Sequence, residues 1–148
     1  MVLPGVCGLA AWLSQNKNII PLIIGSVSLR MLARPLPHIL QHSLIKNTLF
    51  DNIFEKVIKK RDPRSQIVNT SRISNEFQSG GNPLYNGDVP WVNFPMLSLA
   101  RALPKDDIYF PYKEYLTHLD DLDKADIEAI KVTASTLVEV FNLLEEKI

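Results

Sequence analysis

The sequence contains a single cysteine, Cys7, in 148 residues. One thiol cannot form a disulfide within the chain, and it cannot supply the several cysteines of a structural zinc site. We expect Cys7 to be a small buried hydrophobic residue and not a nucleophile, because free cysteine is most often buried in this way. The scarcity of cysteine therefore argues against a small protein held together by disulfides.

The sequence also has no excess of charge of either sign, because 16 Lys and Arg residues balance 16 Asp and Glu residues. Proteins that bind nucleic acids or anionic membranes usually carry a basic surplus that neutralises phosphate groups. We therefore expect neither nucleic acid nor a membrane among the partners of this chain.

No hydrophobic run approaches the roughly 20 apolar residues that a helix needs to cross a bilayer. The most apolar segment covers residues 19–29 and is interrupted by Pro21 and Gly25. The apolar N-terminus, residues 1–13, lacks the positive charges with which a signal peptide begins. We therefore expect a cytoplasmic protein whose thiol is reduced.

The chain is hydrophobic enough to fold around a core, with 46% hydrophobic residues. Its length fits one domain or a piece of a larger one, and we expect a single domain over residues 1–148. Ten prolines and six glycines predict substantial loops between the regular elements.

Hydrophobic periodicity predicts three helices and three strands. The helices are expected over residues 5–16, 44–60 and 124–146, and the strands over 19–29, 66–69 and 94–100. Residues 30–42 are predicted to form a loop, because Pro35 and Pro37 lie close together there and each removes a backbone donor.

The two longer helices are predicted to pack against the sheet through one apolar face each. Ser43 and Asp123 are their expected N-caps. The side chains expected to be buried are Phe50, Phe54, Ile127, Leu137 and Phe141.

The alternation of helices and strands predicts the α/β class, as a partial three-layer arrangement in which helices flank a sheet. Three short strands make a thin sheet with an open edge, and such an edge can pair with another chain. We therefore expect a homo-oligomer or a protein partner, with residues 19–29 or 84–95 at the contact.

His118 and Asp120 are the only metal-site candidates that we single out from the residues alone. The side chains of a His-x-Asp pair share one side of an extended segment and can bind a divalent cation. The alternative is that Asp120, Asp121 and Asp123 form the acidic entry to the last helix, where the helix dipole stabilises negative charge.

Other catalytic patterns are weak or absent. His38 and His42 are four residues apart, but we expect no acidic partner to orient their rings in the way that metal-bound histidines require. Ser79 to Asn82 lacks the Lys-Ser/Thr pair of a phosphate-binding loop, and no Gly-x-Ser-x-Gly motif provides a nucleophile.

Four segments carry motifs of one known family. They are Pro4 to Leu13, Ser43 with Asn47, Asn86-Gly87 with Phe94 to Arg101, and Pro111 to Asp123. Together they resemble the bacterial zinc aminopeptidase-like domain, a member of the zinc peptidase superfamily that is often encoded beside polysaccharide genes. The similarity covers nearly the whole chain and corresponds to the C-terminal half of that domain.

The resemblance implies that the family's metal ligands and catalytic residues are lost in this chain. The family's glutamate in the first helix falls on Gly5, its Asp-Glu pair falls on Gly81 and Asn82, and its last histidine falls on Leu116. A glycine or a leucine can neither bind zinc nor move a proton. His118 lies two positions after Leu116, and it could compensate for the lost histidine only through an adjustment of the loop.

We therefore interpret the chain as a degenerate zinc-aminopeptidase-like domain with a structural or interaction role. In this interpretation it has no catalytic, cofactor-binding or metal-binding residues and no cofactor. Two alternatives stay open. One is an active metallo-aminopeptidase half that uses zinc and is completed by an upstream segment or a partner chain. The other is an unrelated small α/β interaction module.

Overall fold

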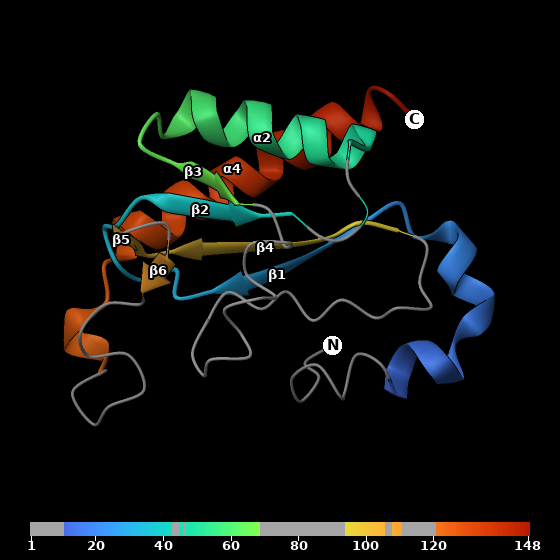
Figure 1. The fold of residues 1–148 in the computed structure, drawn as a ribbon, viewed down its shortest axis with the longest axis horizontal. Coiled ribbons are helices and arrows are strands. Elements are labelled where there is room, and N and C mark those ends of the chain that lie inside the picture. Colours follow the sequence, from blue (N-terminus) through green and yellow to red (C-terminus); the bar gives the residue numbers. More distant parts are fainter. Residues whose placement is uncertain (1–10, 43–44, 46, 69–93, 106–107, 111–120) are drawn as a thin grey trace.

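The computed structural model describes residues 11–42, 45, 47–68, 94–105, 108–110 and 121–148. At its centre is a four-stranded sheet of β1 (Ser26–Arg30), β2 (His38–Gln41), β3 (Gln66–Val68) and β4 (Met96–Arg101). Two helices, α2 (Leu49–Arg61) and α4 (Ile127–Glu145), lie side by side over one face of this sheet (Figure 1). Residues 11–15 are also helical, which confirms the end of the helix expected over 5–16, whereas residues 5–10 lie outside the described ranges.

The sheet has the strand order β1-β4-β2-β3. β1 runs parallel to β4, β2 runs parallel to β3, and β2 runs antiparallel to β4. This mixed sheet with helices packed on it confirms the predicted α/β class. It has four strands instead of the three expected, and a separate hairpin of β5 (Leu103–Lys105) and β6 (Ile108–Phe110) follows β4.

The strand predicted over residues 19–29 is wrong in its first part. Lys17–Leu22 forms a 3-10 helix, η1, and the strand begins only at Ser26. Pro21 lies inside η1, where its fixed φ suits a helical turn. Gly25 then passes so close to Phe50 that a Cβ atom at this position would lie 2.6 Å from the ring. Pro21 therefore lies in the helical turn before β1, and Gly25 allows the chain to pass close to Phe50 just before the strand begins.

The loop predicted over residues 30–42 is also wrong, because it contains β2. This strand pairs with β3 on one side and with β4 on the other, and all of its residues are buried. Its partners come from distant parts of the sequence, so the proline-rich local composition does not reveal it. Pro35 and Pro37 both precede the first residue of the strand, His38.

The two long helices begin later than predicted, because other residues cap them. Thr48, and not Ser43, is the N-cap of α2, and it forms a capping box with Asp51. Asp126, and not Asp123, is the N-cap of α4, where its side chain accepts a hydrogen bond of 3.0 Å from the amide of Ala129. The short strand predicted at 66–69 and the strand predicted at 94–100 are confirmed as β3 and β4.

The face of α4 that packs inward is not the predicted one. Ile127 and Phe141 are 64% and 47% exposed, and Leu137 is only partly buried. The side chains that α4 buries are Ala129, Thr133, Thr136, Val140 and Leu144. The buried threonines fit there because their hydroxyl groups donate to carbonyl oxygens one turn earlier, so no polar atom of theirs lacks a partner.

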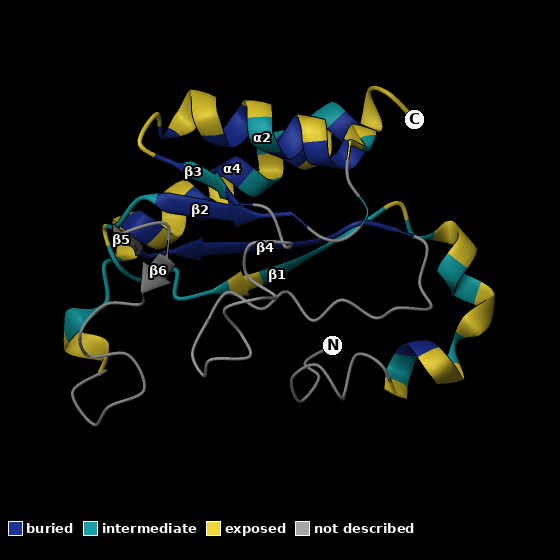
Figure 2. Cartoon of the chain, viewed as in Figure 1, coloured by how far each residue is buried: buried dark blue, intermediate teal, exposed yellow. Residues whose placement is uncertain are grey.

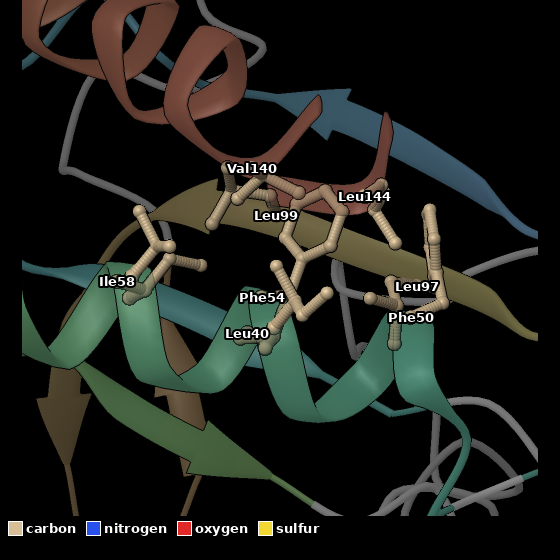
Figure 3. Packing of buried hydrophobic residues seen from close by; sticks show 10 residues of the cluster. Leu40, Phe50, Phe54, Ile58, Leu97, Leu99, Val140 and Leu144 are labelled. Atoms are coloured by element: carbon tan, nitrogen blue, oxygen red, sulfur yellow. The ribbon is translucent and has the colours of Figure 1, made fainter. Parts of the chain in front are cut away.

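The main core lies between the sheet and the two helices. Phe54 and Ile58 of α2 pack there with Leu99 of β4 and Val140 of α4, as Figure 3 shows. Phe50 and Phe54 are buried as predicted. β2 and β4 are buried along their whole length (Figure 2). Truncation of such a phenylalanine typically costs about 3–5 kcal/mol, so this cluster supplies much of the stability.

Among the described residues, no helix combines the length and the apolar character needed to cross a bilayer.

Candidate functional site

Two of the three histidines of the chain lie at opposite ends of β2, on the face of the sheet that the helices cover. His38 is the first residue of β2, and His42 directly follows its last residue. Side chains along a strand alternate between faces, so both rings lie on the side of Leu40, which is part of the core beneath α2. Both residues are buried.

His42 lies between two carboxylates of α2, and we call these three residues the His42 cluster. Its Nδ1 is 3.2 Å from Asp51 Oδ1, and its Nε2 is 2.5 Å from Glu55 Oε1. Asp51 is buried, whereas the side chain of Glu55 is 42% exposed. The expectation that His42 has no acidic partner is therefore wrong. Asp51 and Glu55 are one helical turn apart, so both can reach the same ring.

Asp51 has a second role in the same cluster. Its Oδ2 accepts hydrogen bonds from the amide of Thr48 at 2.9 Å and from the hydroxyl of Thr48 at 2.7 Å. One carboxylate therefore both closes the capping box of α2 and contacts the histidine that ends β2. Asp51 thus fixes where the helix starts relative to the strand.

The geometry of the His42 cluster limits its chemistry. An imidazole ring donates from both nitrogens only when it is protonated, and the neutral ring donates from one. With a carboxylate beside each nitrogen, neither nitrogen points at an open position for a substrate or a metal ion. The cluster is therefore built as a clamp between β2 and α2. Within the described ranges, no group of three or more His, Cys, Asp or Glu side chains is placed to hold a metal ion.

His38 lies in a second buried network at the other end of β2. Its Nε2 is 2.8 Å from Thr133 Oγ1 of α4, and its Nδ1 is 3.7 Å from Asp62 Oδ2. Arg101 donates from Nε to the same threonine hydroxyl at 3.2 Å and from Nη1 to the carbonyl oxygen of Leu36 at 2.6 Å. Here too an acidic side chain lies near the ring, although it is too far for a hydrogen bond.

The electrostatics of this network favour a neutral histidine. Burial and, to a smaller extent, the positive charge of Arg101 together lower the pKa of His38 to about 4, against the opposing effect of Asp62. Burial alone would raise the pKa of Asp62, but hydrogen bonds from Arg64 outweigh it and hold this pKa below its usual value. The network therefore joins β2, β4 and α4 around a ring that carries no charge at neutral pH.

Most of the residues named from the sequence as site candidates lie outside the described residues. They are Gly5, Cys7, Gly81, Asn82, Leu116, His118 and Asp120. Asp121 and Asp123 are described and exposed, and Asp123 lies in a short 3-10 helix, η2 (Leu122–Lys124). Neither caps α4, and the acidic residues at the start of this helix are its N-cap, Asp126, and Glu128 in its first turn.

The sequence contained a signal for the His42 cluster that pattern reading missed. Asp51 and Glu55 are four residues apart on a helix that was correctly predicted, so they lie on one side of it. The sequence pattern does not show that α2 runs back over the end of β2. This arrangement places Asp51 and Glu55 beside His42.

Two further features complete the described surroundings. A largely apolar cavity of about 320 Å³ lies at the start of α2, and its walls include Ile23, Ile45, Phe50 and Phe94. On the opposite face of the sheet, Gln41 and Ser98 are paired across β2 and β4, and their buried side-chain polar atoms have no hydrogen-bond partner among the described residues.

The fold is similar to that of a solved structure from Clostridium acetobutylicum that is provisionally described as a peptidase. The TM-score is 0.70 and the sequence identity is 19%, and the match covers 94% of this chain and 30% of that one. At this identity the similarity shows a common fold alone. This chain spans less than a third of the length of that protein.

No curated protein matches the sequence. A family model described as a domain of unknown function, DUF4910, matches residues 1–147, which is nearly the whole chain. The chain therefore belongs to the DUF4910 family.

Proposed function

We propose that this chain is a zinc-aminopeptidase-like domain that has lost its chemistry and acts as a structural or interaction domain. The peptidase-like fold supports the first half of this proposal, because a fold shared with a protein described as a peptidase agrees with the motif resemblance of the sequence. A shared fold does not carry an activity with it, so the second half depends on the residues themselves.

The observation that carries the proposal is the identity of the residues at the matched family positions. Gly5 and Gly81 have no side chain that can bind a metal, and Leu116 has no donor atom. A hydrolytic zinc site uses three protein ligands and a bound water that a general base activates. These positions supply neither the ligands nor the base.

The two described histidines support the same proposal. His42 contacts carboxylates through both ring nitrogens, and His38 contacts the hydroxyl of Thr133. Recruiting either ring to a metal would break a contact between the sheet and a helix. These residues therefore suit the stability of the domain better than catalysis.

An assay of aminopeptidase activity tests this proposal. The purified full chain, supplemented with zinc, is incubated with a panel of chromogenic aminoacyl substrates. We expect release of product to equal that of a protein-free control, and we expect the His118→Ala variant to behave in the same way. Turnover that a chelator abolishes and that His118→Ala loses would contradict the proposal and favour an active peptidase half.

A further inference from the structure

Helix α4 presents a row of apolar side chains to solvent. The row consists of Ile127, Ile130, Ala134, Val138 and Phe141, and we call it the α4 outer row. The spacing of three and four residues places all of them on one side of the helix. Val138 is 58% exposed and Ile130 is 42% exposed. A helix that faces water on this side would normally carry polar residues there, so the row marks a contact surface.

The inward side of the same helix strengthens this interpretation. It carries Thr133 and Thr136, and it is less apolar than the side that faces out. A monomer gains more free energy when it buries the more apolar side. The observed orientation of α4 is therefore favourable in free energy only if another surface buries the α4 outer row.

Within the described ranges, no strand pairs with the neighbouring edge of the sheet. β1 is one of the two edge strands of the sheet, and among the described residues it pairs only with β4. Its Leu29 is 45% exposed and lies opposite Leu99, on the face that the helices cover. Proline and charged side chains protect edge strands from pairing, and Ser26–Arg30 contains no proline and only one charged residue, Arg30 at its end.

We infer that a second copy of this chain docks on this surface, with β1 pairing to β1 and α4 packing against α4 about a two-fold axis. The inference rests on the proposed function in one respect: the proposed function is that of an interaction domain, and the inference identifies its partner as a second copy. The reason to commit to a second copy is that both elements are complementary to themselves, as a two-fold interface requires.

The strand is self-complementary when it pairs antiparallel about Ser28. Val27 of one copy then lies opposite Leu29 of the other, and the same pair forms again on the other side of the axis. Both side chains are on the helix-covered face, so two aliphatic pairs form beneath the helices. Ser28 lies opposite its own copy on the other face.

The helix is self-complementary about Val138. Lys131 lies two helical turns before Val138 and Glu145 two turns after it, both exposed and on the same side. When two copies of α4 cross antiparallel at Val138, Lys131 of each copy faces Glu145 of the other. Two opposite-charge contacts then flank an apolar centre, which is the pattern that selects this orientation.

The core of one copy connects the centres of the two proposed contacts. Val140 of α4 packs in the same cluster as Leu97 and Leu99 of β4, and Figure 3 shows it against Leu99. Ser98 lies between these leucines and pairs in register with Ser28 of β1. We therefore place a single two-fold axis at Ser28 and Val138, so that one symmetry operation produces both contacts.

Sedimentation of the full chain at micromolar concentration tests the inference. We expect a dimer for the natural sequence. Val138→Lys places two positive charges at the axis and should weaken the dimer more than about tenfold, because like charges that face each other at an interface are strongly unfavourable. Val132→Lys is the matched control, because Val132 is also exposed but lies outside the α4 outer row. This control should remain a dimer.

A charge exchange tests the orientation without a change in the apolar row. Lys131→Glu alone and Glu145→Lys alone should each weaken the dimer, and the double variant should recover it. All of these residues are exposed, so circular dichroism should show an unchanged fold. A monomeric natural chain, or a dimer that Val138→Lys leaves intact, would overturn the inference.

The zinc content of the same samples separates the two proposals. A dimer that carries stoichiometric zinc would contradict the proposed function and leave the interface standing. A zinc-free monomer would contradict the interface and leave the proposed function standing.

Discussion

Thr133 Oγ1 lies 2.8 Å from His38 Nε2, and this contact joins the inward side of α4 to the first residue of β2. The same hydroxyl accepts from Arg101 and donates to the carbonyl oxygen of Ala129. One threonine thus links the helix layer to two strands. A buried hydroxyl with three partners is costly to replace with an apolar group, because the partners lose their contacts as well.

The buried neutral His38 predicts that acid destabilises the fold before the carboxylates titrate. A histidine in the unfolded chain takes up a proton near pH 6.5, whereas His38 in the fold does so only near pH 4. Between these values the unfolded state binds more protons, so the free energy of unfolding falls as the pH falls, by up to about 3 kcal/mol in total. The contribution is fully present above pH 6.5.

Urea denaturation from about pH 7.5 to pH 4 measures this effect. The His38→Gln variant lacks the titrating ring, so the stability difference between the two proteins should shrink as the pH falls. A difference that stays constant over this range would show that His38 does not titrate as described.

Gly25→Ala should destabilise the fold through Phe50. The added Cβ would lie 2.6 Å from the ring of Phe50, so the ring or the backbone must move. Overpacking of this kind typically costs about 1–3 kcal/mol, which thermal and chemical denaturation can measure. In a Phe50→Leu background the same change should cost less, because the obstructing ring is gone. Equal costs in both backgrounds would argue against the close approach.

Gln41 and Ser98 should tolerate apolar replacement unusually well for buried residues. In the part of the chain that the structure describes, the buried polar atoms of their side chains have no hydrogen-bond partner, and unsatisfied buried atoms cost about 1–3 kcal/mol each. We expect Ser98→Ala and Gln41→Met to leave the free energy of unfolding unchanged or to raise it. A marked loss of stability in both variants would mean that these groups have a partner, such as a bound water molecule or ligand.

Truncations of two phenylalanines should separate the buried and the exposed sides of the helices. Phe54 is fully buried, so Phe54→Ala should cost about 3–5 kcal/mol. Phe141 lies in the α4 outer row, so Phe141→Ala should cost much less when it is measured in the Val138→Lys background, where the dimer is weakened. Equal losses in that background would mean that α4 packs inward through the predicted face.

The sequence predicts those elements whose signal is local. The apolar spacing of Phe50 and Phe54 gives both the helix α2 and its buried face, and the apolar run at β4 gives a strand. β2 was missed because a short strand that holds His38 and Gln41 becomes a strand through its neighbours, and its neighbours are distant in sequence. The need for a glycine at position 25 arises from its tertiary contact with Phe50, so the local sequence does not predict it.

The orientation of α4 was missed for a different reason. Apolar periodicity assigns the most hydrophobic side of a helix to the core, and this rule selects Ile127 and Phe141. Thr133 and Thr136 are buried instead, because each hydroxyl finds a carbonyl oxygen in its own helix. In the same way, the acidic partners of His42 follow from the chain reversal between β2 and α2, which no local pattern contains.

The zinc content of the purified full chain tests the central claim most directly. The chain is incubated with excess zinc, dialysed against metal-free buffer and analysed for metal, together with the His118→Ala variant. Gly5, Gly81 and Leu116 offer no ligands at the matched positions, so we predict zinc well below one equivalent in both proteins. One equivalent of zinc in the natural chain that disappears in His118→Ala would contradict the account.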